Sequence, residues 1–372
     1  MQEDQIKNKS QNFIPALTGI RGVSVYFIFF YHNNIFSVSD SPRSFNFVNQ
    51  FYTFVTFLFV LSGFVICHKY YSISSLNKKD LYNYFVNRFS RIFPILFILT
   101  TATFLLQYLY HLDTPSHIIK TWFYNVTLLK GFSSEYYLTG IAPSWSLTPD
   151  WFFYTVCPFI FFYMAKPSSL IKVILLFYIL GILITFMFSS FNIKGFFSSY
   201  AFTFFVTFFG RVFEFACGIY LAMVVNGKFK KRLLEKIGKF SLFYGLFIIF
   251  LALTGLYLIT QIYNVPNGSD VWQGIVINNI VMPIGITILF YSLIFHKSHL
   301  QIFLSTGIMI ALGDATYSFY LLHTSFILNW ITKFLGRNIF ISFFAMLIFS
   351  YCFYKVVEQP LSKFFRKKLH TK

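Results

Sequence analysis

Residues 17–35 read LTGIRGVSVYFIFFYHNNI, an apolar run that contains one arginine, Arg21, and one histidine, His32. A helix needs about 20 mostly apolar residues to cross the hydrocarbon core of a bilayer. The run has no small-residue cleavage site of the kind that ends a signal peptide. We therefore predict that it forms a membrane-spanning helix that is retained in the protein.

The spacing of the two ionisable residues places them on one face of this helix. Eleven positions separate Arg21 from His32, which is close to three full turns, with an axial separation of roughly 16 Å. Ionisable groups inside a bilayer are costly and commonly mark function. A topogenic arginine and an interfacial histidine explain the pair equally well, so both interpretations stay open at this point.

The composition of the whole chain is also that of a membrane protein. Hydrophobic residues make up 56% of the 372 residues and charged residues 11%, with a mean hydropathy of +0.64, whereas soluble domains carry about a quarter charged residues. No long polar stretch remains for a second, soluble domain. We predict one all-α polytopic domain over residues 1–372, with helices from about 17 to 357 and a basic cytoplasmic tail at 358–372.

Charge and cysteine usage argue against two other classes of protein. A formal net charge of +18 would suggest nucleic-acid binding in a soluble protein. Here the Lys and Arg residues stand in short clusters between apolar runs, which is the pattern that sets membrane topology. We therefore expect no nucleic-acid partner. The four cysteines lie in or beside apolar runs without metal-ligand spacing, so we expect buried thiols and no metal site.

Ten membrane spans are predicted along the chain. With the N-terminus inside, 23 Lys and Arg residues fall on the inner side and six on the outer side, which predicts cytoplasmic termini. The ninth span is too long for one crossing, and Gly313-Asp314 is a natural break, with the crossing resuming near Ala315. The connection 112–149 is long enough to hide a re-entrant element. The predicted spans are 17–35, 47–68, 92–111, 150–165, 170–189, 199–225, 240–262, 271–295, 304–332 and 338–357.

Three charged residues stand at the ends of predicted spans. Arg88 and Arg91 precede the third span, and two arginines at this spacing can bind phosphate bidentately, although cytoplasmic anchoring alone also explains them. Asp150 follows Pro149 at the start of the fourth span, where a helix-capping role is the alternative. The predicted topology puts Asp150 on the outer side, at a depth close to that of His32.

Four further ionisable residues lie within or at the end of predicted spans. Arg211 and Glu214 are three residues apart and are expected to neutralise each other. His323 lies near the middle of the ninth span, where a hydrogen-bonded core histidine is the more frequent case. Glu358 ends the tenth span, and we expect a structural ion pair with the arginines that precede the third span. On these residues alone, a transporter and a membrane enzyme fit equally well.

An ordered series of motifs resembles that of the acyltransferase 3 family. The first is an arginine, ten residues and a histidine in the opening helix. Each motif alone is weak, but seven in register cover nearly the whole chain. They are LTGIRG at 17–22 with Tyr31-His32, FVLSGF at 59–64, RFSRIFP at 88–94, WSL at 145–147 with Asp150 and Tyr154, RVFEF at 211–215 with Gly218, Gly313 with Tyr317-Ser318, Tyr320-Leu321 and His323, and EQP at 358–360.

The chain departs from the family pattern at the fourth span. The family usually has glutamate where this chain has Asp150, and a residue other than proline where it has Pro149; the carboxylate is retained, one methylene shorter. Many relatives add an extracytoplasmic hydrolase-like domain after the last helix. This chain stops about a dozen residues past Glu358, so we expect a stand-alone form.

The resemblance implies a multi-pass O-acyltransferase of the bacterial inner membrane. It would transfer an acyl group, most often acetyl, from acyl-CoA to a hydroxyl of a cell-surface or lipid-linked glycan such as lipopolysaccharide O-antigen. Acetyl-CoA would be a substrate and not a tightly bound cofactor, and the partners would be the glycan and membrane lipid. The alternatives are a transporter or flippase of a lipid-linked glycan, and an acyltransferase for a small cytoplasmic acceptor.

Roles for individual residues follow from this resemblance. Arg21, Arg88 and Arg91 would hold the phosphates of coenzyme A, while His32 would act as general base and Asp150 would orient its ring. An acyl-enzyme on a serine is the alternative to direct transfer. The candidates for an oxyanion or acceptor site are Ser62, Trp145, Ser146, Tyr154, Arg211, Glu214 and His323.

Overall fold

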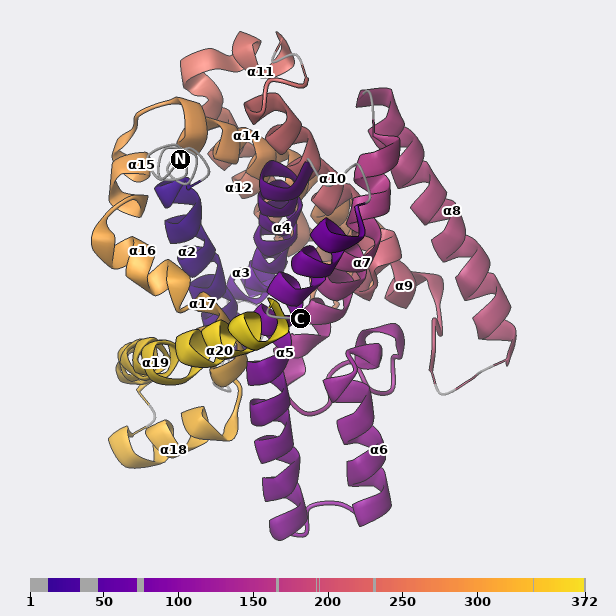
Figure 1. The fold of residues 1–372 in the computed structure, drawn as a ribbon. Helices are drawn as coiled ribbons and strands as arrows, with labels where there is room; N and C mark the ends of the chain where they lie inside the picture. Colours follow the sequence, from indigo (N-terminus) through magenta and orange to yellow (C-terminus); the bar gives the residue numbers. More distant parts are fainter. Residues whose placement is uncertain are drawn as a thin grey trace.

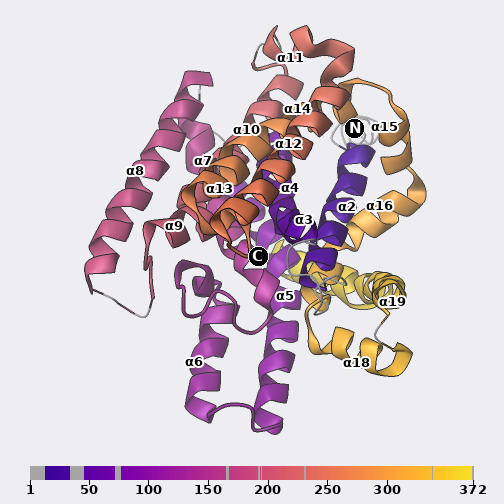
Figure 2. The ribbon, with the colours of Figure 1, turned by 180° about the vertical axis from the view of Figure 1, so that it is seen from behind.

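The computed structural model describes residues 13–33, 46–71, 77–164, 167–191, 193, 195–229, 232–336 and 338–370. This part of the chain folds into helices, and within it we find no strand beyond one isolated bridge between Ser133 and Phe196. Figure 1 and Figure 2 show the arrangement from opposite sides. Residues 34–35 of the first predicted span and residues 371–372 of the tail lie outside the described residues.

Seven helices in the described ranges are long and apolar enough to cross a membrane. The structure therefore confirms an all-α polytopic membrane protein, while ten crossings with cytoplasmic termini stay a prediction. The predicted third and tenth spans belong to longer helical segments than expected, because α5 begins at Lys78 and α20 ends at His370. The seven are Phe47–Tyr70, Lys78–Leu109, Ser168–Phe191, Tyr200–Val225, Leu234–Tyr263, Trp272–Phe295 and Ile339–His370.

The centre of the molecule is formed by α2 (Pro15–His32), α4 (Val55–Tyr70) and α10 (Phe208–Val225). Two glycines allow α4 and α10 to pack backbone against backbone. A Cβ at Gly63 would meet the carbonyl oxygen of Phe215, and one at Gly218 would meet that of Val60. In a membrane, lipid is as apolar as leucine, so burying apolar side chains does little to drive helices together. Small residues promote association instead, because they let the helix backbones pack closely.

Two regions lie outside this centre. The C-terminal half of α5 (Lys78–Leu109) and the antiparallel α6 (Pro115–Val126) extend from one end of the molecule (Figure 1), joined where Trp122 Nε1 donates to Thr101 Oγ1 at 3.0 Å. Helix α8 (Pro167–Phe191) lies at one edge in both views. Its exposed side carries large apolar side chains, including Leu175 and Phe186, which suits a surface against lipid.

The region predicted as the ninth span is broken twice. Helix α16 (Gly307–Asp314) ends at the predicted break, and α17 (Thr316–Leu322) follows. A second break, which the sequence analysis missed, precedes α18 (Phe326–Leu335), whose first turn is capped by the hydroxyl of Ser325. The crossing expected from Ala315 is therefore not one continuous helix, because this cap starts a new helix.

The remaining helices complete the described structure. Helices α19 and α20, joined by a π-helical turn at Tyr354–Glu358, run across the direction of α2 in Figure 1. The helices whose bounds have not yet been given are α3 (Asn46–Asn49), α7 (Leu147–Tyr163), α9 (Tyr200–Val206), α11 (Arg232–Ile237), α12 (Ser241–Tyr263), α13 (Trp272–Val276), α14 (Met282–Phe295), α15 (His299–Leu304), α19 (Ile339–Phe353) and α20 (Gln359–His370).

Candidate functional site

A cavity with about 780 Å³ of empty space lies between α2, α4, α5, α7 and α17. Charged and hydroxyl-bearing side chains from helices far apart in the sequence meet in it. The residues of the sequence-based site that line it are Arg21, Ser62, Arg88, Arg91, Ser146, Asp150 and Tyr154.

Arg21 is held at the edge of this cavity by close packing of α2 on α16. A Cβ at Gly313 would meet the backbone of Thr18, so only glycine allows this approach. The Nε and Nη2 atoms of Arg21 donate to the Gly313 carbonyl, with Nε at 3.1 Å. A carboxylate oxygen of Asp314 is 3.9 Å from Nη2. The end of a short helix therefore fixes the direction of the guanidinium group.

Arg88 and Arg91 bring two more guanidinium groups to the cavity from α5. Arg88 is buried, its Nη2 donates to the Tyr70 hydroxyl at 3.2 Å, and its Nε has no partner among the described residues. The rings of Tyr70 and Tyr154 flank its guanidinium carbon at 5.2 and 5.8 Å. Neither arginine has an ion pair within the described part of the chain. Both keep donors available for an anionic ligand.

Asp150 reaches the cavity from the first turn of α7. Its Oδ1 is buried and finds no hydrogen-bond partner in the described structure. The hydroxyl of Ser62 and the positive charge of Arg91 both favour the ionised form of this carboxyl group. Ser62 Oγ also lies 3.5 Å from the Tyr154 hydroxyl. An unpartnered buried carboxyl oxygen is costly, and such groups commonly mark a ligand site.

His32 does not line this cavity, so the structure does not bring His32 and Asp150 together there as expected. Its exposed ring lies at the end of α2, with its centroid 5.3 Å from that of His323. Within the described residues we find no hydrogen bond or ion pair between His32 and Asp150. The reason is the packing: Asp150 faces side chains of α4 and α5, whereas the ring that faces His32 follows α17.

The hydrogen bonding of His323 fixes the tautomer of its ring. It is fully buried, and its Nδ1 lies 2.8 Å from the carbonyl oxygen of Tyr320. Because a carbonyl oxygen only accepts, Nδ1 carries the hydrogen and the neutral ring has its lone pair on Nε2. Nε2 is buried and has no partner among the described residues. The backbone thereby leaves a basic nitrogen free.

Tyr320 forms one wall of the cavity, between it and the histidine pair. Its hydroxyl donates to the Pro143 carbonyl at 2.8 Å and lies 2.7 Å from Ser146 Oγ. Ser146 Oγ also lies 3.2 Å from the Pro143 carbonyl oxygen, so the two hydroxyl groups and this carbonyl form one hydrogen-bonded cluster. The Ser146 hydroxyl is therefore engaged in the wall, which makes it a poor candidate for donating to an oxyanion.

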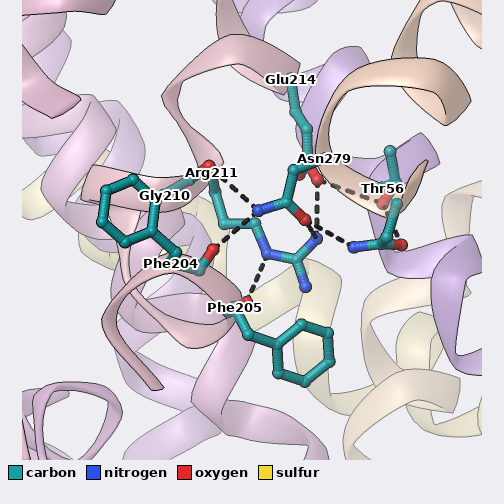
Figure 3. A network of polar contacts seen from close by, with 8 residues as sticks. Thr56, Phe204, Phe205, Gly210, Arg211, Glu214 and Asn279 are labelled. Atoms are coloured by element: carbon teal, nitrogen blue, oxygen red, sulfur yellow. Dashed lines mark hydrogen bonds and ion pairs between the residues drawn. The ribbon is translucent and has the colours of Figure 1, made fainter. Parts of the chain in front are cut away.

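Arg211 and Glu214 belong to a separate buried network, shown in Figure 3. Their ion pair, predicted from the spacing, joins Arg211 Nη1 to Glu214 Oε1 at 2.6 Å, with both side chains at most 2% exposed. Asn279 accepts from Arg211 at 3.1 Å and donates to the backbone of Phe204 and Gly210. This network links α9, α10 and the π-helical turn before α14, which suits a structural role, although Oε2 of Glu214 is buried without a partner among the described residues.

Trp145 and Glu358, two other residues singled out from the sequence, contact residues outside the first cavity. Trp145 lies beside this network, with its ring 6.0 Å from the guanidinium carbon of Arg211. Glu358 accepts a hydrogen bond from the Ser318 hydroxyl, and the described residues show no ion pair between it and Arg88 or Arg91. The charges of Arg91 and Arg21 nevertheless act on the Glu358 carboxyl group, so the π-helical turn at the end of α19 places Glu358 near these arginines without a direct ion pair in the described structure.

Lys130 is a buried charged residue that the sequence analysis did not single out. Its Nζ donates to Asn125 Oδ1, the carbonyls of Thr139 and Ile141, and Ser144 Oγ at 2.7–3.0 Å. Burial lowers the pKa of Lys130 to about 7, and the four oxygen acceptors oppose this by favouring the ammonium form. Lys130 thus ties together the connection that leads to α7 and Asp150.

A second cavity adjoins the first at Arg21. Both are lined by Arg21, Leu61 and Val65, and the second extends to His68 and Lys69 at the end of α4. The two cavities together form a route along α2 and α4 that passes Arg21. Within the described residues, no group of three or more His, Cys, Asp or Glu side chains is placed to hold a metal ion.

Comparison with known proteins agrees with the motifs. No curated protein and no solved structure gives a significant match to the chain. The family model described as "Acyltransferase domain", of the acyltransferase 3 family, matches residues 14–355, which include every residue of the arginine-lined cavity. The chain therefore belongs to the acyltransferase 3 family and is a multi-pass membrane acyltransferase.

Proposed function

We propose that this acyltransferase moves an acyl group, most simply acetyl, from acyl-CoA to a hydroxyl of a cell-surface or lipid-linked glycan, such as lipopolysaccharide O-antigen, at the bacterial inner membrane. The observation that carries the proposal is the cavity into which Arg21, Arg88 and Arg91 converge. Arg91 has no hydrogen bond or ion pair within the described structure. Unpaired guanidinium groups in a concave site suit a polyanionic phosphate ligand.

The adjoining cavities suit the shape of coenzyme A, which is a charged nucleotide on a long, neutral pantetheine arm. The phosphates would lie between Arg21, Arg88 and Arg91, with Lys69 of the outer cavity beside them. The arm would continue along α2 toward Tyr320. The predicted topology places Lys69 on the cytoplasmic side, where acyl-CoA is made.

The reaction needs one proton transfer. The sugar hydroxyl attacks the thioester carbonyl, His32 takes the hydroxyl proton, and the C–S bond breaks as the ester C–O bond forms. The protonated ring then gives its proton to the departing thiolate. In this scheme His323, with its free Nε2, replaces Asp150 as the group that orients His32. Asp150 acts in the donor cavity, beside Ser62 and Arg91.

The proposal is tested by thiol release from acetyl-CoA with purified protein in nanodiscs. The acceptor is polysaccharide extracted from the envelope of the source cells. We expect wild type to release thiol, His32→Ala to release none, and Phe334→Ala, an 83% exposed position on α18, to match wild type. Failure of wild type to bind or cleave acetyl-CoA at any concentration, with or without polysaccharide, contradicts the proposed donor. A glycan transport assay is then the next experiment.

A further inference from the structure

A third cavity lies further along α5, away from the arginines. Ile92 is the last α5 residue in the first cavity and Thr103 the first in the third. Eleven positions of one continuous helix separate them, which is roughly 16 Å. The third cavity is closed by α18, and Figure 1 shows α18 and the C-terminal half of α5 at the same end of the molecule. The predicted topology makes this the outer side.

The chemistry of the third cavity differs from that of the first. The described side chains that line it carry no charge. Trp330 and Tyr110 present aromatic rings that are 52% and 68% exposed. The side-chain amides of Gln107 and Asn329 also line it, and neither has a hydrogen-bond partner among the described residues. Thr324 Oγ1 is buried and likewise has no partner in the described structure.

Such a lining fits a neutral, polyhydroxylated ring. The C–H face of a pyranose packs on an aromatic ring, while amides both donate to and accept from hydroxyl groups. Phe326 packs edge-on against the indole of Trp330, with the ring centroids 5.2 Å apart, so the two side chains form one aromatic surface. A polyanion such as coenzyme A finds no counter-charge here. The first and third cavities are therefore suited to different ligands.

The position of the third cavity connects it to the reacting groups. Thr324 directly follows His323, whose ring faces His32. Ile141 lines the third cavity, and its carbonyl oxygen accepts from Ser144, next to the wall formed by Pro143 and Tyr320. The end of α17 thus has the acyl-donor cavity on one side and the third cavity on the other.

We infer that the third cavity is the acceptor subsite, and that it binds a neutral pyranose unit of the glycan through Trp330, Asn329 and Gln107. This inference rests on the proposed function and deepens it. The sugar hydroxyl would be presented to His32 and His323 from the outer side, while the thioester arrives from the arginine side. The apolar part of the lining, including Leu106 and Phe326, also suits a lipid, which is the competing occupant.

The test compares Trp330→Ala, Asn329→Ala and Gln107→Ala with wild type in nanodiscs. Envelope polysaccharide and radiolabelled acetyl-CoA are varied separately. Loss of one ring contact or one amide should raise the KM for polysaccharide about tenfold, while the KM for acetyl-CoA stays within twofold. Phe334→Ala, on the same helix but outside the cavity, is the matched control. Trp330→Phe should retain most of the affinity and guards against misfolding.

Three outcomes overturn the inference. One is an unchanged polysaccharide KM in all three folded variants. Another is an equal rise in both KM values, which indicates a general loss of structure. The third is transfer of label to nanodisc phospholipid instead of polysaccharide, which identifies a lipid acceptor. If wild type transfers no label at all and binds no acetyl-CoA, the proposed function itself fails, and this result is distinct from the other three.

Discussion

The imidazole rings of His32 and His323 lie 5.3 Å apart, centroid to centroid, although 291 positions separate the two residues in the sequence. The Tyr320 carbonyl fixes the hydrogen of His323 on Nδ1, which leaves Nε2 without a partner among the described residues. The lone pair on Nε2 of His323 can accept a hydrogen bond from an N–H of the His32 ring and so select the tautomer of His32. The ring contact therefore joins the end of α2 to the end of α17, and the proposed proton transfer would use it.

If His323 positions His32, His323→Gln should lower kcat about a hundredfold and leave the KM for acetyl-CoA unchanged. His32→Ala should abolish turnover, and adding His323→Gln to it should have no further effect, because coupled residues are not additive. Stopped-time thiol release measures both constants. A purely structural role would instead reduce the amount of folded protein while the kcat per folded molecule stays the same.

Arg91 should bind phosphate. Arg91→Ala is expected to weaken acetyl-CoA binding about tenfold to a hundredfold, because charge-assisted hydrogen bonds are lost. Arg91→Lys should retain part of the affinity, and added salt should reduce the difference between wild type and Arg91→Ala. Acetyl-pantetheine, which lacks the nucleotide phosphates, is the matched ligand. An equal effect of Arg91→Ala on both ligands would contradict a phosphate contact.

The buried ion pair of Arg211 with Glu214 should contribute to stability more than to catalysis. Arg211→Met leaves the Glu214 carboxylate buried without its partner, which costs about 3–5 kcal/mol. The double variant Arg211→Met/Glu214→Gln should recover part of this loss. Heating in nanodiscs followed by size-exclusion chromatography measures stability. If kcat per folded molecule falls sharply in the double variant, the assignment of this network as structural is wrong.

Close packing of α4 on α10 predicts the effect of one methyl group. Gly218→Ala places a Cβ against the backbone of Val60 and should destabilise the protein by about 1–3 kcal/mol. Gly307→Ala is the matched control, because no atom lies within 4 Å of a Cβ built there. We expect the thermal midpoint to fall in the first variant only. Equal midpoints would show that the two helices can separate without loss.

Lys130 should hold the connection between α6 and α7 in place. Lys130→Met keeps the length of the side chain but leaves the oxygens of Asn125, Thr139 and Ile141 without their donor, at a cost of about 1–3 kcal/mol. Limited proteolysis of this connection should become faster. Ile119→Met, at a 66% exposed position on α6, is the control. Equal rates of proteolysis in both variants would mean that other contacts hold the connection between α6 and α7.

Much of the candidate site could be predicted from the sequence. Arg21, Arg88, Arg91 and Asp150 were identified by motif and by the cost of a charge in an apolar run, and the structure gathers all four in one cavity. The Arg211–Glu214 pair follows from helical spacing, which needs no tertiary information. The break at Gly313-Asp314 was predicted from residue type and span length.

Three expectations from the sequence differ from the arrangement found: two concerned which side chains meet, and one concerned where a helix ends. Asp150 was expected beside His32 because both were placed at a similar depth, but depth does not fix the direction in which two helices face. Glu358 was expected to bind an arginine, yet the π-helical turn at 354–358 directs it to Ser318. The break after His323 was missed because Ser325 reads as one more residue of an apolar span.

By itself, then, the sequence determined the membrane, the helices, the family and most of the charged residues, because hydropathy, helical period and motif order are properties of the chain alone. Only the tertiary structure decided that His323 is the partner of His32, that Ser146 is engaged by Tyr320, and that an uncharged cavity lies beyond the arginines. These relations depend on the rotation and tilt of packed helices. Such orientations come from many side chains packing together, and no local pattern encodes them.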